Sequence, residues 1–255
     1  MKKLIYILTL ALLIVSLATR ADADSFSWYC KREQDHKTPS CPPEYSFINE
    51  LNAFDHDSRH TDYNEKEKVI YLTFDAGYEN GNIEKTLNIL KDNNVTAAFF
   101  ILGNLIEKNP ELVKRMFEEG HLVCNHTYSH KDMSKVDEAE FLKELKKLDA
   151  CCAEKTGHSP AKLYRPPEGR FSYENLEWAK NSGYKTIFWS FAYADWDNKK
   201  QPHVNEARKK IFDNLHNGEI MLLHPTSATN CAILDEFIKH AKSEGFRFAS
   251  LTELE

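Results

Sequence analysis

The sequence lacks several features that would place it in a familiar class of protein. The six cysteines include no C-x-x-C pair, so a zinc ribbon is not supported. No run rich in Lys and Arg stands out, and the net charge is −6, whereas phosphate backbones require a basic face. Short repeats and low-complexity tracts are also missing from the 255 residues. We therefore expect no nucleic-acid partner, and one large globular domain with a short arm.

The first 23 residues have the pattern of a secretory signal peptide. Lys2 and Lys3 precede an apolar run over residues 4–18, and Ala-Asp-Ala at 21–23 offers a cleavage site. An uncleaved membrane anchor is the alternative, although the run is short for a full span. No cysteine follows the run closely, which disfavours a lipid anchor, and no second apolar stretch could cross a membrane. The mature chain is expected to be secreted, extracytoplasmic and without a membrane span.

Residues 24–64 are polar and dotted with aromatic side chains. We interpret them as an irregular N-terminal arm that packs on a main domain over residues 65–255. Cys30 and Cys41 lie in this arm and could form a disulfide, which export would permit. The adjacent pair Cys151–Cys152 is disfavoured by disulfide geometry. The pairing pattern stays open at this point.

From Val69 onward, predicted strands alternate with predicted helices. The strands are expected at 69–74, 97–103, 121–125, 163–165, 185–190, 219–223 and 246–249. The helices are expected at 83–93, 111–119, 137–156, 173–181, 205–216 and 231–244. This alternation implies parallel strands joined by crossover helices. About seven strands suit a closed β/α barrel and also allow an open sheet.

Polar side chains follow five of these strands, where both architectures collect their chemistry. They are Asp75, His126, Arg165, the pair Asp195–Trp196 and His224. Since the carboxyl ends of parallel strands share one edge of the sheet, these residues are expected to meet at one mouth.

The spacing of His126 and His130, in HTYSH, would place both imidazoles on one face of a helix and allow them to bind one metal ion. Two surface or loop histidines are the alternative. The glutamate of the helical zinc-protease motif is missing, which disfavours that chemistry. The position directly after a strand favours the metal interpretation.

Two candidate acid–base residues end strands. A partly desolvated Asp75 would suit a general base, although Asp also caps helices. His224, oriented by Asp195, would suit a general acid, although backbone groups could instead satisfy its ring. Arg165 begins the rigid turn RPPEG and could hold Asp75 ionised through a bidentate contact, or lie on the surface.

Taken in order, these segments resemble carbohydrate esterase family 4, the polysaccharide deacetylases with a NodB homology domain, over about residues 69–254. The matching segments are TFDAG (73–77), HTYSH (126–130), RPPEG (165–169), DW (195–196) and LLH (222–224). The resemblance implies a distorted (β/α) barrel of about seven parallel strands. It also implies a hydrolase that releases acetate from N-acetylated sugars.

The resemblance assigns a role to each site residue. Asp75 would be the base that activates water, oriented by Arg165, and His224 would protonate the leaving amine, tuned by Asp195. His126 and His130 would bind a divalent metal, commonly zinc. The remaining side chains would bind substrate: the backbone N–H near Glu168 would hold the oxyanion, and Trp196 and Leu222 would line the pocket of the acetyl methyl group.

One departure from the family pattern narrows the expected substrate. The second aspartate of the family motif, a metal ligand, is Ala76 here, so the metal should be held weakly. TFDAGYENG (73–81) and WSFAYADWD (189–197) resemble the delta-lactam-type de-N-acetylases, which also lack that aspartate. Those act on muramic acid residues of peptidoglycan during spore formation, where the freed amine closes to muramic δ-lactam.

The leading hypothesis is therefore a monomeric, cell-wall-associated deacetylase acting on N-acetylmuramic acid in the peptidoglycan glycan strand. A rival within the class is a deacetylase of N-acetylglucosamine in peptidoglycan or a chitin-like glycan. A rival outside it is a non-catalytic glycan-binding protein on the same fold, which Ala76 would explain.

Overall fold

The computed structural model describes residues 24–254, so the expected signal peptide at 1–23 lies outside the described range. The strands are β1 Phe26–Ser27, β2 Ala53–Phe54, β3 Lys68–Ala76, β4 Ala98–Ile101, β5 Leu122–Asn125, β6 Ala161–Tyr164, β7 Arg170–Phe171, β8 Lys185–Ile187, β9 Glu219–Leu223 and β10 Phe246–Phe248. The α-helices are α1 Asn82–Asp92, α2 Gly103–Lys108, α3 Pro110–Glu118, α4 Glu138–Thr156, α5 Tyr173–Asn181, α6 Val204–Asp213 and α7 Ala228–Ser243. Short 3-10 helices are η1 Pro43–Leu51, η2 Met133–Lys135, η3 Pro167–Gly169 and η4 Leu251–Glu253.

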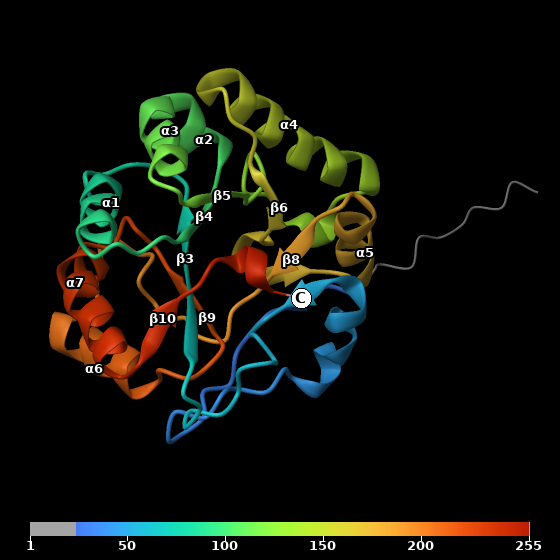
Figure 1. Ribbon diagram of the computed structural model, residues 1–255. Coiled ribbons are helices and arrows are strands. Elements are labelled where there is room, and N and C mark those ends of the chain that lie inside the picture. The colour runs from blue at the N-terminus through green and yellow to red at the C-terminus, as the bar shows by residue number, and fades with distance from the viewer. Residues whose placement is uncertain (1–23, 255) are drawn as a thin grey trace, which may run out of the picture.

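The main sheet confirms the expected parallel architecture. Its path is β10-β3-β4-β5-β6-β8-β2, with β9 pairing β3 as well, and every named pairing in it is parallel. Beyond β8 the chain returns to β9, where Phe191 forms a bridge to Met221. The sheet therefore curls into a distorted barrel, with the helices outside it (Figure 1).

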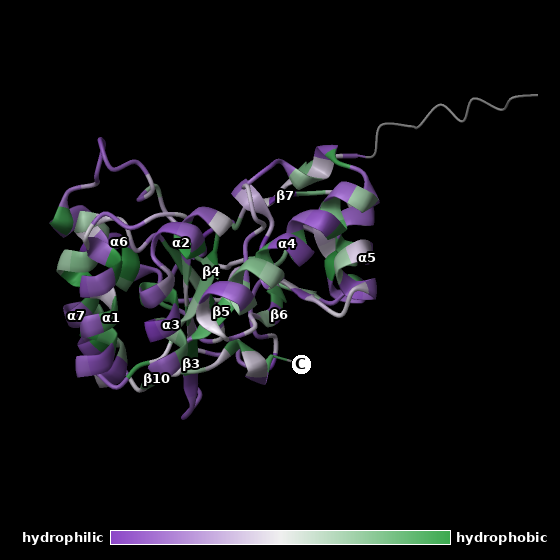
Figure 2. Cartoon of the chain, turned by 90° about the horizontal axis from the view of Figure 1, so that it is seen from above, coloured by the Kyte–Doolittle hydropathy of each residue, from purple (hydrophilic) through white to green (hydrophobic). Residues whose placement is uncertain are grey.

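Strand β3 shows why the barrel has two cores. Its side chains alternate between faces, and both faces are buried. Val69 and Tyr71 belong to the core inside the barrel, whereas Ile70 and Leu72 belong to the core under the helices. Figure 2 shows the matching pattern, with hydrophobic residues on the strands and hydrophilic residues on the outer sides of the helices.

The N-terminal arm is more regular than the sequence indicated. It contains η1 and contributes β2, an eighth parallel strand that pairs with β8. Figure 1 shows the arm, in blue, lying beside β8 and α5. A core cluster joins the arm residues Trp28, Tyr45 and Ile48 to Phe171 and Phe188 of the main domain. The arm is thus built into the barrel wall.

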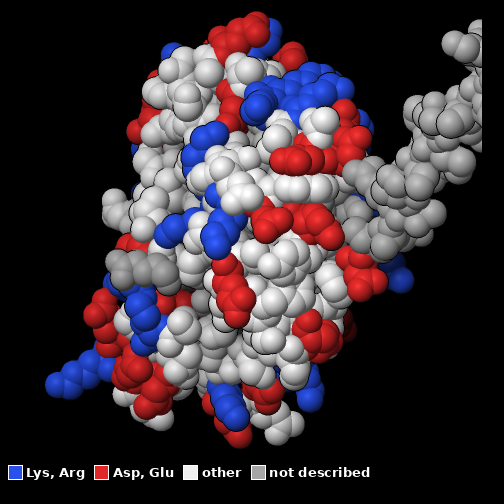
Figure 3. Space-filling view, turned by 90° about the vertical axis from the view of Figure 1, so that its right-hand side faces the viewer, with Lys and Arg blue, Asp and Glu red and all other residues white. Residues whose placement is uncertain are grey.

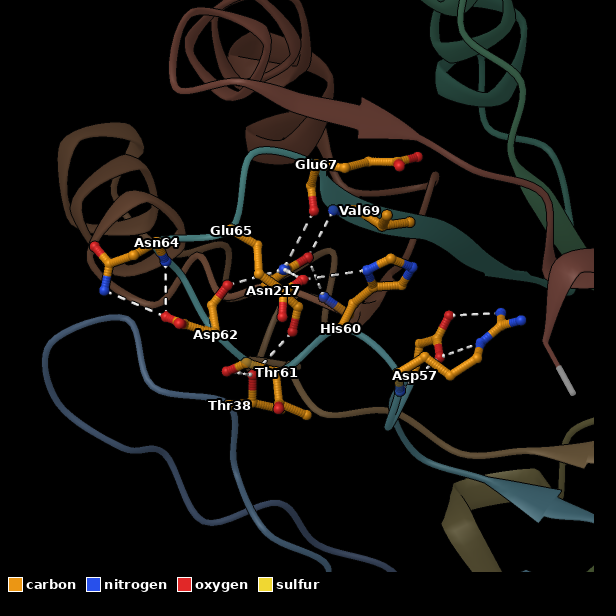
Figure 4. Close-up of polar contacts among 12 residues, drawn as sticks. Thr38, Asp57, His60, Thr61, Asp62, Asn64, Glu65, Glu67, Val69 and Asn217 are labelled. Carbon is orange, nitrogen blue, oxygen red and sulfur yellow. Dashed lines mark hydrogen bonds and ion pairs between the residues drawn. The ribbon is translucent and has the colours of Figure 1, made fainter.

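The turn before β9 connects the end of the arm to the amino-terminal ends of strands β3 and β9. Asn217 accepts hydrogen bonds from the N–H groups of Val69 (2.8 Å) and Gly218 (3.0 Å), and its amide donates to the Asp62 carbonyl (3.0 Å) (Figure 4). Gly218 has φ of 73°, and a Cβ there would lie 2.3 Å from the His60 carbonyl oxygen. Only glycine fits at position 218, where the turn passes close to the backbone of the arm.

The described surface carries charges of both signs. Figure 3 shows acidic and basic side chains interspersed over the face that it displays. All six cysteines lie within residues 24–254 and are free thiols there, so the disulfide that the sequence allowed between Cys30 and Cys41 is not formed. Within the same residues, none of the helices has the length and apolar character needed to span a membrane.

Candidate active site

The carboxyl ends of the strands surround one pocket of about 720 Å³. Seven of the nine residues singled out from the sequence line it: Asp75, His126, His130, Glu168, Trp196, Leu222 and His224. The other two, Arg165 and Asp195, are fully buried and contact the lining residues. The structure therefore brings together residues that are up to 149 positions apart, from Asp75 to His224, as expected for strand ends of a barrel.

Asp75 lies at the end of β3 and points into the barrel, because it continues the inward-facing series of Tyr71 and Thr73. Arg165 Nη1 donates to Asp75 Oδ1 (2.8 Å) and also to Thr73 Oγ1 (2.9 Å). The other guanidinium nitrogens donate to the carbonyls of Ile187 (3.0 Å) and Phe188 (3.1 Å). The expected bidentate contact is thus a single one, since the backbone of β8 and the residue after it engages the rest of the guanidinium.

The surroundings of Asp75 favour its ionised form. Burial alone would raise the pKa of Asp75, but the positive charge of Arg165 and its hydrogen bond to Asp75 outweigh burial and lower the pKa below its ordinary value. Asp75 is consequently a carboxylate at neutral pH, with only 10% of its side chain exposed. Such a group can accept a proton from a water molecule in the pocket.

His126 has one ring nitrogen fixed and one directed toward Asp75. Its Nδ1 lies 2.9 Å from the Arg165 carbonyl oxygen, so Nδ1 carries the proton, and its Nε2 lies 3.5 Å from Asp75 Oδ2. Burial lowers the pKa of His126 to about 4, which keeps the ring neutral at neutral pH. A neutral imidazole with a backbone partner on Nδ1 is the arrangement found in metal-binding histidines.

The helical interpretation of HTYSH is wrong. Residues 126–130 form a loop after β5, and Thr127 and His130 have left-handed φ values of 69° and 58°. Side chains stabilise this loop: Thr127 Oγ1 accepts the His130 N–H (3.0 Å), and the buried Glu144 accepts the N–H (2.8 Å) and hydroxyl (2.8 Å) of Ser129. The loop still brings the two imidazoles together, with ring centroids of His126 and His130 5.0 Å apart.

These two imidazoles fit a divalent metal as a pair of ligands and no more. Among residues 24–254, no group of three or more His, Cys, Asp or Glu side chains is arranged to hold a metal ion. Ala76 lines the pocket where the family pattern has a carboxylate ligand. Any metal here would therefore depend on water or substrate oxygens to complete its coordination.

His224 follows β9 and is oriented by a fully buried carboxylate. Its Nδ1 lies 2.7 Å from Asp195 Oδ1, and its backbone N–H donates to Asp195 Oδ2 (2.8 Å). Asn230, at the start of α7, donates to the same Oδ2 (2.5 Å). Burial would lower the pKa of His224, but the hydrogen bond and charge of Asp195 outweigh it and raise the pKa. His224 can thus carry a proton on Nε2, facing the pocket.

The RPPEG turn supplies backbone to the opposite wall of the pocket. Glu168 has φ of 55° and Gly169 of 66°, both in the left-handed region. The Glu168 carboxylate is exposed and lies 3.2 Å from Arg170 Nε. A Cβ on Gly169 would lie only 2.8 Å from the Trp189 ring, so this position requires glycine.

Aromatic side chains form the mouth of the pocket. Trp196 is 61% exposed and Tyr78 is 46% exposed, and both line the pocket. The Trp196 and His224 rings pack edge to face, with their centroids 6.4 Å apart. Exposed aromatic faces at a pocket rim are suited to stacking against sugar rings. Tyr78 was not singled out from the sequence, although it lies in the quoted segment TFDAGYENG.

Comparison with known proteins gives a consistent result. Residues 62–187 match the family model described as polysaccharide deacetylase. The chain is 36% identical over 260 residues to the peptidoglycan-N-acetylmuramic acid deacetylase PdaA of Bacillus subtilis, covering 100% of this chain and 96% of that protein. It is 34% identical over 196 residues to a peptidoglycan-N-acetylglucosamine deacetylase of Bacillus cereus, covering 75% of this chain and 69% of that protein.

The fold agrees with the sequence comparison. The solved structure of Bacillus subtilis PdaA, described as a family 4 carbohydrate esterase, superposes with a TM-score of 0.84 at 36% identity. The superposition covers 91% of this chain and 97% of that one. The similarity therefore includes the arm as well as the barrel.

Proposed function

Since the chain belongs to the polysaccharide deacetylase family, we propose that it hydrolyses the N-acetyl groups of peptidoglycan, with N-acetylmuramic acid as its substrate residue. One observation carries the chemistry: a carboxylate and an imidazole face the same pocket, and each has its own buried partner of opposite charge. Arg165 keeps Asp75 ionised, and Asp195 favours protonated His224. A base and an acid are thus available at the same pH.

Amide hydrolysis follows from this arrangement. Asp75 removes a proton from water as the water oxygen attacks the acetyl carbon. The backbone N–H at the Glu168 turn stabilises the negative oxygen that develops. His224 then donates its proton to the amide nitrogen, the C–N bond breaks, and acetate leaves with a free sugar amine. A divalent metal on His126 and His130 would polarise the acetyl carbonyl and lower the pKa of water.

The muramic substrate is supported by full-length similarity to a protein named for that substrate. It is also supported by Ala76, because the delta-lactam-type de-N-acetylases that the sequence resembles lack the second aspartate. A freed muramic amine has a lactyl carboxylate within reach and can close to a δ-lactam. The proposed role is therefore a step toward muramic δ-lactam in the spore cortex. We propose that the chain acts as a monomer outside the cytoplasm, after cleavage of residues 1–23.

Two alternatives remain testable. Similarity to an N-acetylglucosamine deacetylase favours that sugar as a second candidate substrate, in peptidoglycan or a chitin-like glycan. The missing aspartate at position 76 favours a non-catalytic glycan-binding protein. The hydrogen-bonded Asp195–His224 pair argues against the latter, because binding alone needs no oriented acid.

Acetate release separates these possibilities. Peptidoglycan stripped of stem peptides is incubated with the protein and a series of divalent metals, in parallel with N-acetylglucosamine oligomers. Release from the muramic substrate is expected to exceed release from the oligomers. The reverse ratio would identify an N-acetylglucosamine deacetylase, and no release with any metal would contradict an enzymatic role.

The variant Asp75→Asn tests the proposed base. It is expected to bind the glycan as wild type does while acetate release falls by at least about 10²-fold, the smaller of the usual contributions of a general base. Asp197→Asn is the matched control, because Asp197 is an exposed carboxylate two residues after Asp195. Equal activity of wild type and Asp75→Asn would contradict the assigned base.

A further inference from the structure

The arm holds three backbone carbonyls of the pocket lining. The Trp28 backbone N–H donates to the Gly169 carbonyl (2.8 Å), and the Trp28 indole N–H donates to the Trp189 carbonyl (2.9 Å). Arg32 donates to the Ala192 carbonyl (2.8 Å). Gly169, Trp189 and Ala192 all line the pocket, whereas Trp28 and Arg32 do not. The arm therefore supports the pocket wall from outside.

The Trp189 carbonyl follows two backbone carbonyls that accept hydrogen bonds from Arg165 on the inner side of the barrel wall. Arg165 donates to the carbonyls of Ile187 and Phe188, and the next carbonyl, that of Trp189, accepts the Trp28 indole. Residues 187–189 are thus fixed between two donors. Because Arg165 also contacts Asp75, a shift of this segment would displace the guanidinium that orients the base.

Trp28 also holds the RPPEG turn in place. β1 pairs with β7 directly after the turn, and Trp28 continues that pairing to Gly169. A Cβ on Gly169 would lie 3.1 Å from Trp28 Cβ and 2.8 Å from Trp189 Cη2, so the turn lies between two tryptophans. The Trp28 ring, 5% exposed, stacks on Phe188 with centroids 4.5 Å apart. Trp28 therefore has little freedom to move.

We propose that Trp28 is a positioning residue of this active site, acting through the backbone of two pocket walls. Its two N–H groups set the position of the Glu168 turn, to which the proposed mechanism assigns the stabilisation of the developing negative oxygen, and of the segment that anchors Arg165. The inference rests on the proposed deacetylase function. It also gives the arm a catalytic purpose in addition to its contribution to the core.

The variant Trp28→Phe removes the indole N–H and keeps an aromatic ring on Phe188. Its backbone N–H still donates to the Gly169 carbonyl, so the wall that loses a donor is the segment that anchors Arg165. Because Arg165 orients the base, which acts in the transition state, kcat should fall roughly tenfold with KM unchanged. Tyr45→Phe is the matched control. Its hydroxyl donates to the Ser27 carbonyl (3.0 Å) in the same arm cluster, but that bond does not end on a pocket residue. Tyr45→Phe should therefore keep kcat within about twofold of wild type.

Thermal unfolding of both variants, followed by circular dichroism, shows how much each loses in stability. A wild-type kcat in folded Trp28→Phe, or equal losses of kcat in both variants, would overturn the positioning role. If Trp28→Phe does not fold, site-specific replacement of Trp28 by benzothienylalanine decides, because that residue keeps the bicyclic ring on Phe188 and lacks the N–H that donates to the Trp189 carbonyl. A lower kcat at unchanged KM supports the proposal, and a wild-type kcat overturns it. A wild type that releases no acetate contradicts the deacetylase function instead.

Discussion

At the residue scale, the site separates its acid from its base by giving each a buried partner of opposite charge. Arg165 lowers the pKa of Asp75, and Asp195 raises that of His224. Both shifts widen the pH range in which Asp75 is ionised while His224 is protonated. Neither partner lines the pocket, so both act without competing for substrate.

Ala76 replaces the metal-binding aspartate of the family pattern, and this replacement gives a direct prediction. Ala76 ends β3 beside the core under the helices, yet it also lines the same pocket as His126 and His130. We therefore expect a longer carboxylate side chain at this position to reach the metal as a third ligand. Ala76→Asp should bind Zn²⁺ at least about tenfold more tightly than wild type. Loss of a group that only supports a metal ligand already lowers metal affinity by about tenfold or more, so a direct ligand should contribute at least as much. Isothermal titration calorimetry at neutral pH measures the difference.

Ala76→Asn controls for added bulk, since it has the same shape without the charge. Ala76 is fully buried, so both variants are checked for folding before titration. Equal Zn²⁺ affinity in the Asp and Asn variants would show that position 76 does not face the metal. It would also weaken the assignment of His126 and His130 as ligands.

Sequence patterns could identify the ionisable site residues because each follows a recognisable strand. They could not identify the partners that depend on tertiary contacts. The position of Thr73, two residues before Asp75, places it on the same face of β3, so its contact with Arg165 was predictable from strand periodicity. The hydrogen bond from Asn230 of α7 to Asp195 could not be predicted from the sequence, because the position of Asn230 in a helix does not show which carboxylate it contacts.

At the element scale, long periodic segments were predicted well and short paired ones were not. The seven strands and six helices expected after residue 65 are all present, most of them with shifted ends. The two-residue strands β1 and β2 exist only through pairing with distant β7 and β8, which periodicity cannot reveal. HTYSH is not helical, because the local hydrogen bond from the His130 N–H to Thr127 competes with helical ones and the distant Glu144 holds Ser129 in the loop.

His121, which lies where the paired strands β4 and β5 begin, should make the stability of the fold depend on pH. His121 Nδ1 accepts the Ala97 N–H (3.2 Å), and burial lowers its pKa to about 4. The folded state therefore favours neutral His121. This contribution to stability is complete above the unfolded pKa of about 6.5 and is lost as pH falls toward 4.

His121→Asn isolates this effect, because the asparagine oxygen can still accept the Ala97 N–H. Between pH 7 and pH 5, the free energy of unfolding of wild type should fall by on the order of 1–2 kcal/mol more than that of the variant. Urea denaturation at the two pH values measures it. The comparison with the variant cancels His56 and His224, whose raised pKa values act in the opposite direction. His158→Asn, on the surface, is the control, and parallel slopes for wild type and His121→Asn would contradict the assignment.

At the scale of the whole molecule, arm and barrel form one folding unit. The core cluster around Trp28 contains residues from η1, β2, β7, α5 and the segment after β8, so neither part is buried without the other. The arm also contacts the turn before β9 at the amino-terminal end of the barrel strands, where Thr38 donates to the Asn217 carbonyl (2.9 Å). A structure connected at both ends should unfold in one step.

Ile48→Ala tests this cooperativity from within the arm. Ile48 is fully buried in η1, so its truncation should cost about 2–5 kcal/mol of unfolding free energy. Circular dichroism, which reports mainly on the helices around the barrel, and tryptophan fluorescence should shift to the same lower urea midpoint. Glu50→Ala, exposed in the same 3-10 helix, should change the free energy by no more than about 0.5 kcal/mol. A fluorescence transition that moves while the circular dichroism transition stays in place would show that the arm unfolds separately, and would remove the physical basis for coupling Trp28 to the active site.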